Sequence, residues 1–470
     1  MVSMDVVRVL AIDLGASSGR GIVFEYSGGK IKETTVHRFE NGAILKDGKY
    51  VWDIEKLFSG VKNSIKLANE KVGKLDSVGI DTWGVDFGLL DRDGKLLGYP
   101  RCYRDEANGV MRRKLQDDDY DFFSMAGISI NDFNTTYQLA VLSEEVQNWD
   151  DVSCLLFMPQ LIGYMLTGKT SVEPTIASTS GIFDLETGFN ERFLSRYRIP
   201  KRIFPNVKKT GDILGQIKAE IKAECNINYE LPVVLTAGHD TACAVLGVPS
   251  KDETLYLSSG TWSLFGTIVD KAVINKVTYD NLYTNELAFD GRVRLLKNII
   301  GMWIIGECKK EWDKAGINLP YDEIVERAKK AKKYAVIDVN APEFFTHGNM
   351  LDKIKNYAKT YQNIELDGVG EIAKTVYYSM AIAYEKAYHD LCKITNKRYE
   401  RLHIIGGGAN NYYLNELIAE TLKIPVWAGP VEASALGNAL GQLLGIKVIE
   451  KEQVKDVIIN SYFIKIFDVN

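Results

Sequence analysis

The sequence predicts a mixed α/β protein with two domains, each organised around a sheet. Its 470 residues exceed the usual size of a single domain. Apolar runs with strand character alternate with longer stretches that have helical apolar spacing, as in α/β folds. Two similar stretches, each a strand, a turn of small residues and a second strand, lie about 245 residues apart, which indicates a weak internal duplication.

The composition describes an ordinary globular protein and excludes several functional classes. Hydrophobic residues make up 46% and charged residues 25% of the chain, enough for a sizeable core. The net charge of −5 does not favour nucleic acid as a partner. Six cysteines are scattered singly, without a C-x-x-C pair or a Cys/His cluster, so neither a zinc site nor a disulfide framework is predicted.

No leader and no membrane span are predicted. The N-terminus carries Asp5 and passes directly into a strand, whereas a signal peptide has a basic and then an apolar region. No apolar run approaches the roughly 18 residues that a membrane helix needs. The single cysteines fit a reducing compartment. We therefore expect a cytoplasmic protein with no membrane partner.

The first of the two similar stretches, residues 9–24, predicts a phosphate-binding hairpin. An apolar run ends at Asp13, five small residues follow, and β-branched residues return after Arg20. Residues 15–19 have little or no side chain, so a ligand can approach their backbone, and the serine hydroxyls add donors for an anion. Asp13 ends a buried strand beside this cradle, where a carboxylate is well placed to hold Mg²⁺ through waters.

Residues 15–19 also match the G-x-S-x-G elbow of hydrolases, and an ordinary hairpin without a ligand is a further alternative. The elbow needs a helix after its serine, but residues 20–26 favour a strand.

Residues 163–170 formally match the Walker A pattern. A true P-loop follows a strand and opens a helix. This match contains large apolar residues and closes a predicted helix, with Gly168 as its C-cap, so we expect no nucleotide there.

The other elements follow from apolar spacing and from the turn residues between them. Strands are predicted at residues 31–39, 77–81, 153–158, 231–237, 254–269 (a hairpin), 294–298 and 402–405. Helices are predicted at residues 53–72, 106–115, 138–149, 159–166, 242–246, 301–315, 321–332, 368–394, from 411 onward and from within 429–435. Residues 247–252 form the best linker between domains.

Three turns carry residue types suited to ligands. Trp83 beside Gly84 at a strand end is a plausible sugar platform, because an aromatic face packs on C–H bonds and a glycine backbone supplies close hydrogen bonds. Core packing of Trp83 is an equally weighted alternative. Residues 406–408 are three glycines, which allow a flat base or ribose to lie against backbone, but they lack the dinucleotide spacing. The hairpin at 254–269 repeats the plan of the first, so the two could grip a triphosphate from both sides.

Taken in order, these motifs resemble those of the FGGY carbohydrate kinases, within the actin-like, ribonuclease H-like ATPase fold. The resemblance spans nearly the whole chain, and its matching stretches are residues 13–20, 37–42, 79–87, 103–105, 166–168, 239–242, 256–262, 296–299, 406–408 and 428–434. It implies an α/β fold of two actin-like (ribonuclease H-like) ATPase domains with a central cleft. Residues 1–247 are expected to form the sugar and phosphate side, and residues 248–470 the nucleotide side.

The resemblance implies ATP-dependent phosphorylation of a ketose, with Mg²⁺, by a monomer or homodimer. Within the family it is closest to members that act on L-rhamnulose, so L-rhamnulose 1-phosphate in rhamnose catabolism is the expected product. Kinases for L-fuculose or a pentulose share the site and remain alternatives. An actin-like ATPase without kinase function is the alternative from another class, although no separate domain for peptide binding or polymer contacts is visible.

The resemblance also implies roles for single residues. Asp240 matches the general base, and an N-cap role in the helix from Thr241 is the alternative. The positions that match ATP contacts are Ala16, Ser17, Ser18, Gly19, Arg20, Thr261 and Gly407. The positions that match sugar contacts are Gly84, His239, Asp240, Thr241 and Asn298. Two positions depart from the family, because Gln160 stands where an aspartate is usual and Gly306 where a glutamine would contact ATP.

Overall fold

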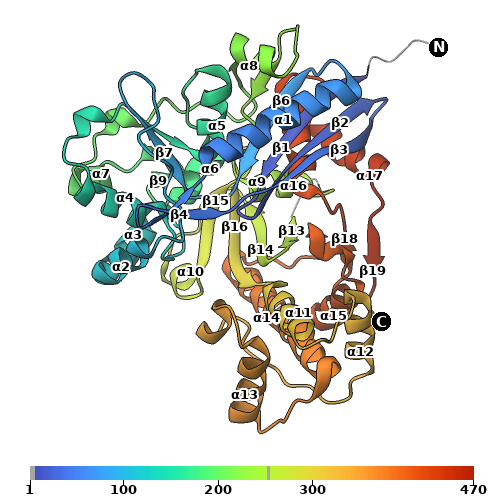
Figure 1. The fold of residues 1–470 in the computed structure, drawn as a ribbon. Helices are drawn as coiled ribbons and strands as arrows, with labels where there is room; N and C mark the ends of the chain where they lie inside the picture. The colour runs from blue at the N-terminus through green and yellow to red at the C-terminus, as the bar shows by residue number, and fades with distance from the viewer. Residues whose placement is uncertain (1–5, 251–253, 470) are drawn as a thin grey trace. The chain divides into compact units, whose positions relative to one another are not determined.

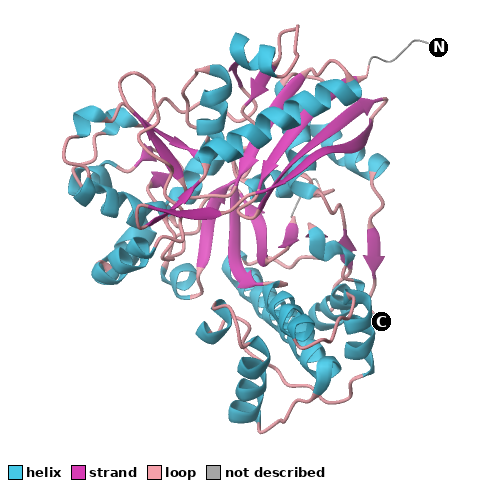
Figure 2. Ribbon diagram, viewed as in Figure 1, coloured by secondary structure: helices cyan, strands magenta, loops and turns pink. Residues whose placement is uncertain are grey.

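The computed structural model describes residues 6–250 and 254–469, which form two compact units. Unit 1 comprises Met1–Lys251, Ile268–Leu295 and Ala433–Ser461, and unit 2 comprises Asp252–Thr267, Leu296–Glu432 and Tyr462–Asn470. Both units contain helices and strands (Figure 2). The mixed α/β class with two domains is therefore confirmed. Part of the expected linker, residues 251 and 252, lies outside the described residues, and the domain boundary at residue 247 stays a prediction.

Unit 1 is built around a six-stranded sheet with the order β11-β12-β6-β1-β2-β3. Its strands are β1 (Val7–Leu14), β2 (Ser18–Ser27), β3 (Lys30–Glu40), β6 (Ser77–Thr82), β11 (Ile213–Gln216) and β12 (Pro232–Val234). Strands β12, β6 and β1 run parallel, whereas β2, β3 and β11 pair antiparallel with their neighbours. The carboxyl ends of the three parallel strands consequently meet at one edge of the sheet.

The predicted β1–β2 hairpin is confirmed, with Leu14 opposite Gly19 at its turn. Helix α1 (Ile54–Val72) lies across one face of the sheet (Figure 1). A Cβ at Gly21 of β2 would touch Ser64 of α1. Helix α16 (Ala433–Gly445) covers the opposite face. It packs so closely there that a Cβ at Gly79 of β6 would meet side chains of α16. The sheet is therefore covered by helices on both faces, and its three parallel strands are mostly buried, including the polar residues Asp13, Ser77, Asp81 and Thr82.

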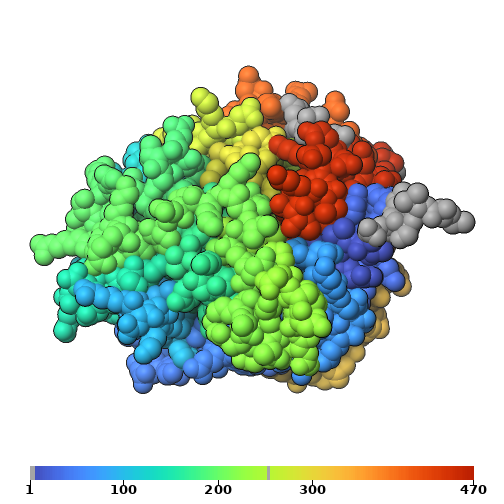
Figure 3. Space-filling view, turned by 90° about the horizontal axis from the view of Figure 1, so that it is seen from above, coloured from blue at the N-terminus to red at the C-terminus, as the bar shows by residue number. Residues whose placement is uncertain are grey.

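The other helices of unit 1 are mostly short. They are α2 (Glu106–Lys114), α3 (Asp119–Ala126), α4 (Thr135–Glu145), α5 (Met158–Thr167), α6 (Pro174–Ala177), α7 (Glu191–Arg196), α8 (Ala219–Glu224), α9 (Asp240–Leu246), α10 (Lys276–Asp280) and α17 (Val454–Ser461). In Figure 3 the red C-terminal segment lies beside the blue N-terminal segment, in agreement with the hydrogen bond of 2.8 Å from the Ile31 backbone N–H of β3 to the Ser461 hydroxyl of α17.

Small two-stranded sheets and a second apolar cluster complete unit 1. The strand pairs are β4 (Ala43–Lys46) with β5 (Lys49–Trp52), β7 (Phe87–Leu90) with β8 (Cys154–Phe157), and β9 (Phe183–Asp184) with β10 (Gly188–Phe189). One buried cluster lies under the main sheet and α1, and it includes Ile12, Val61 and Leu156. The second gathers aromatic and aliphatic side chains around Phe157, Tyr137 and Phe193. These clusters fix the sheet edge from which the candidate site is built.

A seven-stranded sheet has the order β15-β16-β14-β13-β17-β18-β19. Its strands are β13 (Leu255–Ser259), β14 (Trp262–Val269), β15 (Tyr283–Leu287), β16 (Val293–Ile300), β17 (Leu402–Ile405), β18 (Val426–Ala428) and β19 (Lys465–Phe467). The helices of unit 2 are α11 (Trp303–Lys314), α12 (Tyr321–Lys330), α13 (Met350–Gln362), α14 (Gly368–Thr395) and α15 (Tyr412–Leu422). The long helix α14 carries a continuous row of buried residues, as its apolar spacing predicts.

Most predicted elements are confirmed, with shifts where local bonding overrides apolar spacing. The helix predicted at 138–149 occurs earlier, as α4, because Val146 is already extended and ends it. The strand predicted at 231–237 is shorter, because the chain bends after Val234 and the Thr236 N–H bonds back to the Val234 carbonyl at 2.9 Å. No helix of the described residues is both long and apolar enough to cross a bilayer.

Candidate active site

In unit 1, the ends of the three parallel strands bring the predicted residues together. The Trp83 N–H, just after β6, bonds to the Leu14 carbonyl at the end of β1 at 3.2 Å. The Thr82 N–H bonds to the Gly238 carbonyl, after β12, at 2.9 Å. These two bonds place the end of β1, the end of β6 and the start of α9 side by side. Each of the three contributes one carboxylate to the same sheet edge.

The carboxylate from β1 is Asp13, and its partner is Arg20. The two residues lie opposite each other across the β1–β2 hairpin, and Asp13 is buried. Arg20 donates from Nε at 3.0 Å and from Nη2 at 2.8 Å to the same Asp13 oxygen, Oδ2. The guanidinium, expected to contact ATP, thus also neutralises and orients the carboxylate expected to hold Mg²⁺. The pairing gives this end of the hairpin a fixed geometry.

The turn between β1 and β2 is held by its own backbone and by one neighbouring side chain. The Gly15 N–H bonds to the Ser18 carbonyl at 2.9 Å, and Asn41 Nδ2 donates to the Gly15 carbonyl at 2.8 Å. Ser17 and Ser18 are exposed. A Cβ at Gly19 would come within 2.4 Å of the Phe39 ring, so this glycine is required by packing as well. A strand rather than a helix follows the turn, which excludes the hydrolase elbow.

The carboxylate from β6 is Asp81, for which the sequence pattern predicts no role. It lies beside Asp13 in the parallel register of β6 and β1. Asn438 of α16 donates to Asp81 Oδ1 at 2.5 Å. Burial, together with the neighbouring charges of Asp13 and Asp240, holds the pKa of Asp81 well above its usual range.

The segment after Asp81 is rigid and strained. Gly84 is half-buried against Thr179, and a Cβ there would lie 3.1 Å from the Thr179 hydroxyl. Val85 has a φ of 70°, in the left-handed region that β-branched residues avoid. Its N–H donates to Thr179 Oγ1 at 3.1 Å, and its carbonyl accepts from Thr135 Oγ1 at 2.6 Å. Such strain persists where the surroundings fix the backbone, and it occurs often at functional sites.

Asp86 explains the orientation of the tryptophan beside Gly84. Its Oδ2 accepts hydrogen bonds from Trp52 Nε1 at 2.6 Å, from Trp83 Nε1 at 3.0 Å and from the Tyr103 N–H at 3.2 Å. Burial raises the pKa of Asp86 to about 7, although these donors and Gln138 oppose the rise. Trp83 is buried, and its ring centroid lies 4.1 Å from that of Trp52. The structure thus favours core packing over a sugar platform for this ring.

The carboxylate after β12 is Asp240, the first residue of α9. The helix N-cap position is His239 and makes no side-chain capping bond, so the alternative that Asp240 caps the helix is wrong. Thr241 Oγ1 donates to Asp240 Oδ1 at 3.0 Å. The Asp240 side chain is 29% exposed, which leaves it open to a ligand. Of the three carboxylates at the edge, Asp240 is the most accessible.

A buried carboxylate holds the loop that leads into Asp240. Glu173 Oε2 accepts from the Gly238 N–H at 2.9 Å and from Thr175 Oγ1 at 2.6 Å. Its Oε1 accepts from Thr210 Oγ1 and from the Thr175 N–H. The Thr175 hydroxyl also lies 3.4 Å from the His239 N–H, which donates to it. Both carboxylate oxygens are therefore satisfied, and the loop before α9 has little freedom.

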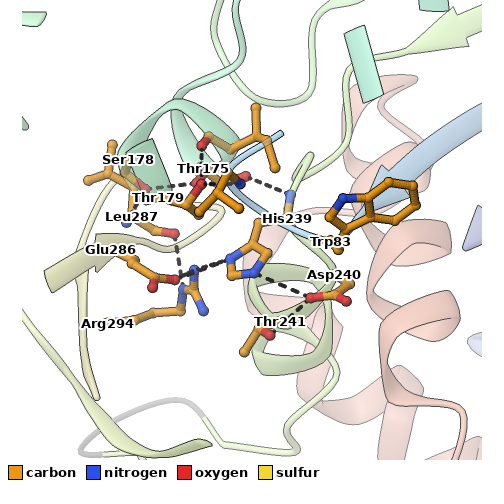
Figure 4. A network of polar contacts seen from close by, with 12 residues as sticks. Trp83, Thr175, Ser178, Thr179, His239, Asp240, Thr241, Glu286, Leu287 and Arg294 are labelled. Carbon is orange, nitrogen blue, oxygen red and sulfur yellow. Dashed lines mark hydrogen bonds and ion pairs between the residues drawn. The ribbon is translucent and has the colours of Figure 1, made fainter. Parts of the chain in front are cut away.

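His239 belongs to a buried charge cluster that Figure 4 shows from close by. Arg294 of β16 donates from Nη2 to Glu286 Oε2 of β15 at 2.8 Å and to His239 Nδ1 at 3.0 Å. His239 Nδ1 lies 3.1 Å from Glu286 Oε2, and His239 Nε2 lies 3.4 Å from Asp240 Oδ1. Although burial raises it, the Arg294 guanidinium holds the pKa of Glu286 below its usual range. The carboxylate of Glu286 is therefore charged.

In unit 2, the residues predicted for the nucleotide occupy adjacent turns. Strands β13 and β17 are parallel neighbours, so Thr261 and Gly407 follow strand ends at one edge of the sheet. Both are exposed, and a Cβ at Gly407 would touch nothing within 4 Å. The Gly301 N–H, just before α11, bonds to the Thr261 carbonyl at 3.2 Å. Asn298 lies half-buried on β16 in the same unit.

The two positions that depart from the family pattern, Gln160 and Gly306, differ in their surroundings. Gln160 is buried on α5, and its Oε1 has no hydrogen-bond partner among the described residues. Gly306 lies on α11, and a Cβ there would meet open space. The position is therefore open on the exposed side of the helix.

The Walker A match is a helix end, as predicted. Helix α5 ends at Thr167, and Gly168 has a φ of 71° as its C-cap.

Lys169→Ala is expected to leave kcat and the KM for ATP unchanged, because Lys169 is exposed and does not lie at the β1–β2 turn. Steady-state kinetics with ATP as the varied substrate check this result. A fall in kcat of a hundredfold or more would contradict the assignment of residues 163–170 as a helix end.

The residues at the edge of unit 1 fit a Mg²⁺ ion that takes most of its ligands from phosphate and water. The described residues contain no group of three or more His, Cys, Asp or Glu side chains arranged as a metal site. Mg²⁺ at phosphate-transfer sites is commonly held by one or two carboxylates, substrate phosphates and waters. Asp13 provides a hard oxygen donor beside the small-residue turn, so the donor set suits such an ion.

Two comparisons with protein sequences cover nearly the whole chain. The N-terminal domain of the FGGY family of carbohydrate kinases matches residues 8–247, and its C-terminal domain matches residues 255–445. The rhamnulokinase of Halalkalibacterium halodurans is 36% identical over 461 residues, which cover 97% of this chain and 97% of the relative. The rhamnulokinase of Bacillus subtilis is 35% identical over 466 residues, with 97% and 94% covered.

Solved structures of sugar kinases share the fold. The xylulose kinase of Lactobacillus acidophilus superposes with a TM-score of 0.82 at 17% identity, covering 98% of this chain and 94% of that one. The glycerol kinase of Plasmodium falciparum with ADP has a TM-score of 0.78 at 15% identity, covering 99% and 94%. At these identities the likeness establishes the fold alone.

Proposed function

The chain belongs to the FGGY family of carbohydrate kinases, and we propose that it transfers the γ-phosphoryl group of ATP to L-rhamnulose. The product would be L-rhamnulose 1-phosphate. The observation that carries this choice of sugar is the similarity to rhamnulokinases at 34–36% identity over at least 93% of the chain. The accessible carboxylate at the sheet edge of unit 1 supports the kinase chemistry.

In this proposal Asp240 is the general base. The primary hydroxyl of the sugar attacks the γ-phosphorus, and its proton passes to Asp240 as the new O–P bond forms. The bond from the γ-phosphorus to the bridging oxygen breaks, and ADP leaves with the electron pair. Asp240 suits this role because it is open to a ligand while Thr241 occupies its Oδ1. Positioning and charge neutralisation supply the rest of the rate, as is usual in phosphoryl transfer.

The residues proposed for ATP are Ala16 to Arg20 in unit 1 and Thr261 with Gly407 in unit 2. The small turn of unit 1 is exposed at its serines, and both residues of unit 2 are exposed at strand ends. Asp13 would hold Mg²⁺, which neutralises phosphate charge when it is bound. Arg20 would keep the Asp13 carboxylate in a fixed orientation.

The residues proposed for the sugar are Gly84, His239, Asp240, Thr241 and Asn298. The first four belong to the strand-end segments of unit 1, where hydrogen bonds to Thr179, Glu173 and Arg294 fix the surrounding backbone and rings. Rigid polar groups recognise hydroxyls well, because a sugar lacking one of them leaves a buried polar group unpaired. This rigidity supports a site that discriminates among ketoses.

The substrate is tested by coupled ADP release against a panel of ketoses and polyols. L-Rhamnulose is expected to have the highest kcat/KM, and L-fuculose is the nearest competitor in the panel. A clear preference for glycerol, xylulose or ribulose would defeat the choice of sugar and leave the kinase class intact. ADP release that no sugar stimulates would instead favour an ATPase without an acceptor.

A further inference from the structure

We propose that Arg294 is a positioning residue that fixes His239 in the tautomer with its proton on Nε2, and that this proton orients Asp240. The part that makes Asp240 the base rests on the proposed function. The part that concerns the tautomer of His239 rests only on the cluster in unit 1 shown in Figure 4.

The first step is the character of Arg294. Its side chain is completely buried on β16, yet a guanidinium keeps its charge in proteins. Glu286 compensates that charge at 2.8 Å, and the Leu287 carbonyl accepts from Arg294 Nε at 3.1 Å. Leu287 is itself tied to the loop before the site, because its N–H donates to Ser178 Oγ at 2.9 Å. The guanidinium is therefore held in one place from two sides.

The second step is the use of Arg294 Nη2. This nitrogen carries two protons and has two acceptors within reach, Glu286 Oε2 at 2.8 Å and His239 Nδ1 at 3.0 Å. An arginine has no acceptor, so the contact with His239 is a hydrogen bond only if Nδ1 carries a lone pair. A proton on Nδ1 would face the Arg294 donor, and the acceptor Glu286 Oε2, 3.1 Å from Nδ1, already receives the hydrogen bond from Arg294. A neutral imidazole then carries its proton on Nε2.

The third step is the direction of that proton. His239 Nε2 lies 3.4 Å from Asp240 Oδ1, and Thr241 Oγ1 donates to the same oxygen at 3.0 Å. A proton on Nε2 would face this oxygen, which already accepts from Thr241, so Oδ2 is left as the oxygen that receives the substrate proton. The order Glu286, Arg294, His239, Asp240 thus connects a fully buried charge to the accessible carboxylate. Fixing the tautomer of a histidine through its second nitrogen is a common way to orient a site.

The tautomer can be measured without any activity. The chain has five histidines, so protein labelled with ¹⁵N at histidine gives a simple long-range ¹H–¹⁵N spectrum. The spectrum of His239→Gln identifies the lost signals. At neutral pH we expect His239 to show an unprotonated Nδ1 and a protonated Nε2. A protonated Nδ1, in the other neutral tautomer or in the imidazolium, would overturn the proposal.

The functional consequence is tested with a charge-balanced double variant. Glu286→Gln with Arg294→Gln removes both buried charges together, so neither is left unpaired. We expect kcat to fall at least about tenfold, as when a catalytic site loses the group that fixes a tautomer. The KM for ATP should stay unchanged, and His239 should show a mixture of tautomers.

The matched control is Asp290→Asn with Arg292→Gln. This pair lies between β15 and β16, has an Arg Nε to Asp Oδ2 distance of 2.9 Å, and is more exposed. This control variant should leave kcat and the His239 spectrum unchanged.

A folded Glu286/Arg294 double variant with kcat within about twofold of the wild type would contradict the positioning role. If that variant does not fold, the wild-type spectrum alone decides. A protein with the expected tautomer but without kinase activity would defeat the proposed function and not the tautomer.

Discussion

Asp240→Asn is expected to lower kcat by about 10²–10⁴-fold, which corresponds to roughly 3–5 kcal/mol of activation free energy. An asparagine has nearly the size of the aspartate and can still accept the Thr241 hydrogen bond, but it cannot take up the substrate proton. The contribution of Asp240 arises mainly in the transition state, so the apparent sugar affinity should change much less than kcat. The Asp13–Arg20 pair and the β1–β2 turn remain intact, and Mg·ATP should bind as in the wild type. Steady-state kinetics and a nucleotide-binding titration measure the two effects separately.

The control for this variant is Asp280→Asn, which removes a carboxylate from an exposed ion pair with Lys276. Exposed pairs contribute little, so activity and stability should stay close to the wild type. If Asp240→Asn retains more than about a tenth of the wild-type kcat, it falls outside the range for a lost general base. Asp240 would then not be the base.

Gly437→Ala is expected to destabilise unit 1 by about 3 kcal/mol, the upper end of the usual cost of overpacking. Helix α16 passes α9 so closely here that an alanine Cβ would lie 1.7 Å from the Cys243 carbonyl oxygen. That atom belongs to the backbone of the helix that begins with Asp240, and it cannot turn away as a side chain would. Scanning calorimetry should show the transition shifted down by more than about 5 °C.

The matched control is Gly306→Ala on α11, where the added Cβ meets nothing within 4 Å. Alanine is favoured over glycine inside a helix by about 1 kcal/mol, so this variant should melt at the same temperature or slightly higher. Equal melting temperatures for Gly437→Ala and the wild type would contradict the close approach of α9 and α16.

Sequence patterns predict the parts of the fold that local chemistry dictates. The β1–β2 hairpin follows from an apolar run, small turn residues and a return to β-branched residues, and α14 follows from unbroken helical spacing. Strands β18 and β19 have three residues each, too few for a period to be visible. Helix α13 is not predicted either, although Met350, Ile354 and Ala358 form a buried row at a spacing of four residues.

The candidate site is only partly visible in the sequence for a similar reason. Asp13 and Asp240 end or follow apolar strands, which is a local signal. Glu286 and Arg294 are 47 and 55 residues from His239, and they reach it only because β15 and β16 bring them there. What distinguishes Glu286 and Arg294 is that both are buried, and the sequence of a short strand does not show whether its charged residues are buried. An arginine among the apolar residues that open β16 is the one signal that could have marked Arg294.

The most direct test of the central claim is the position of the phosphate on the product. Wild-type protein is incubated with ATP, Mg²⁺ and L-rhamnulose, and the sugar product is isolated and examined by ³¹P–¹H correlation NMR. The proposed reaction joins the phosphate to the primary hydroxyl, so the phosphorus should couple to the two protons on C1, and Asp240→Asn should form this product far more slowly. A phosphate on another carbon, or ADP with free inorganic phosphate and unchanged sugar, would contradict the account.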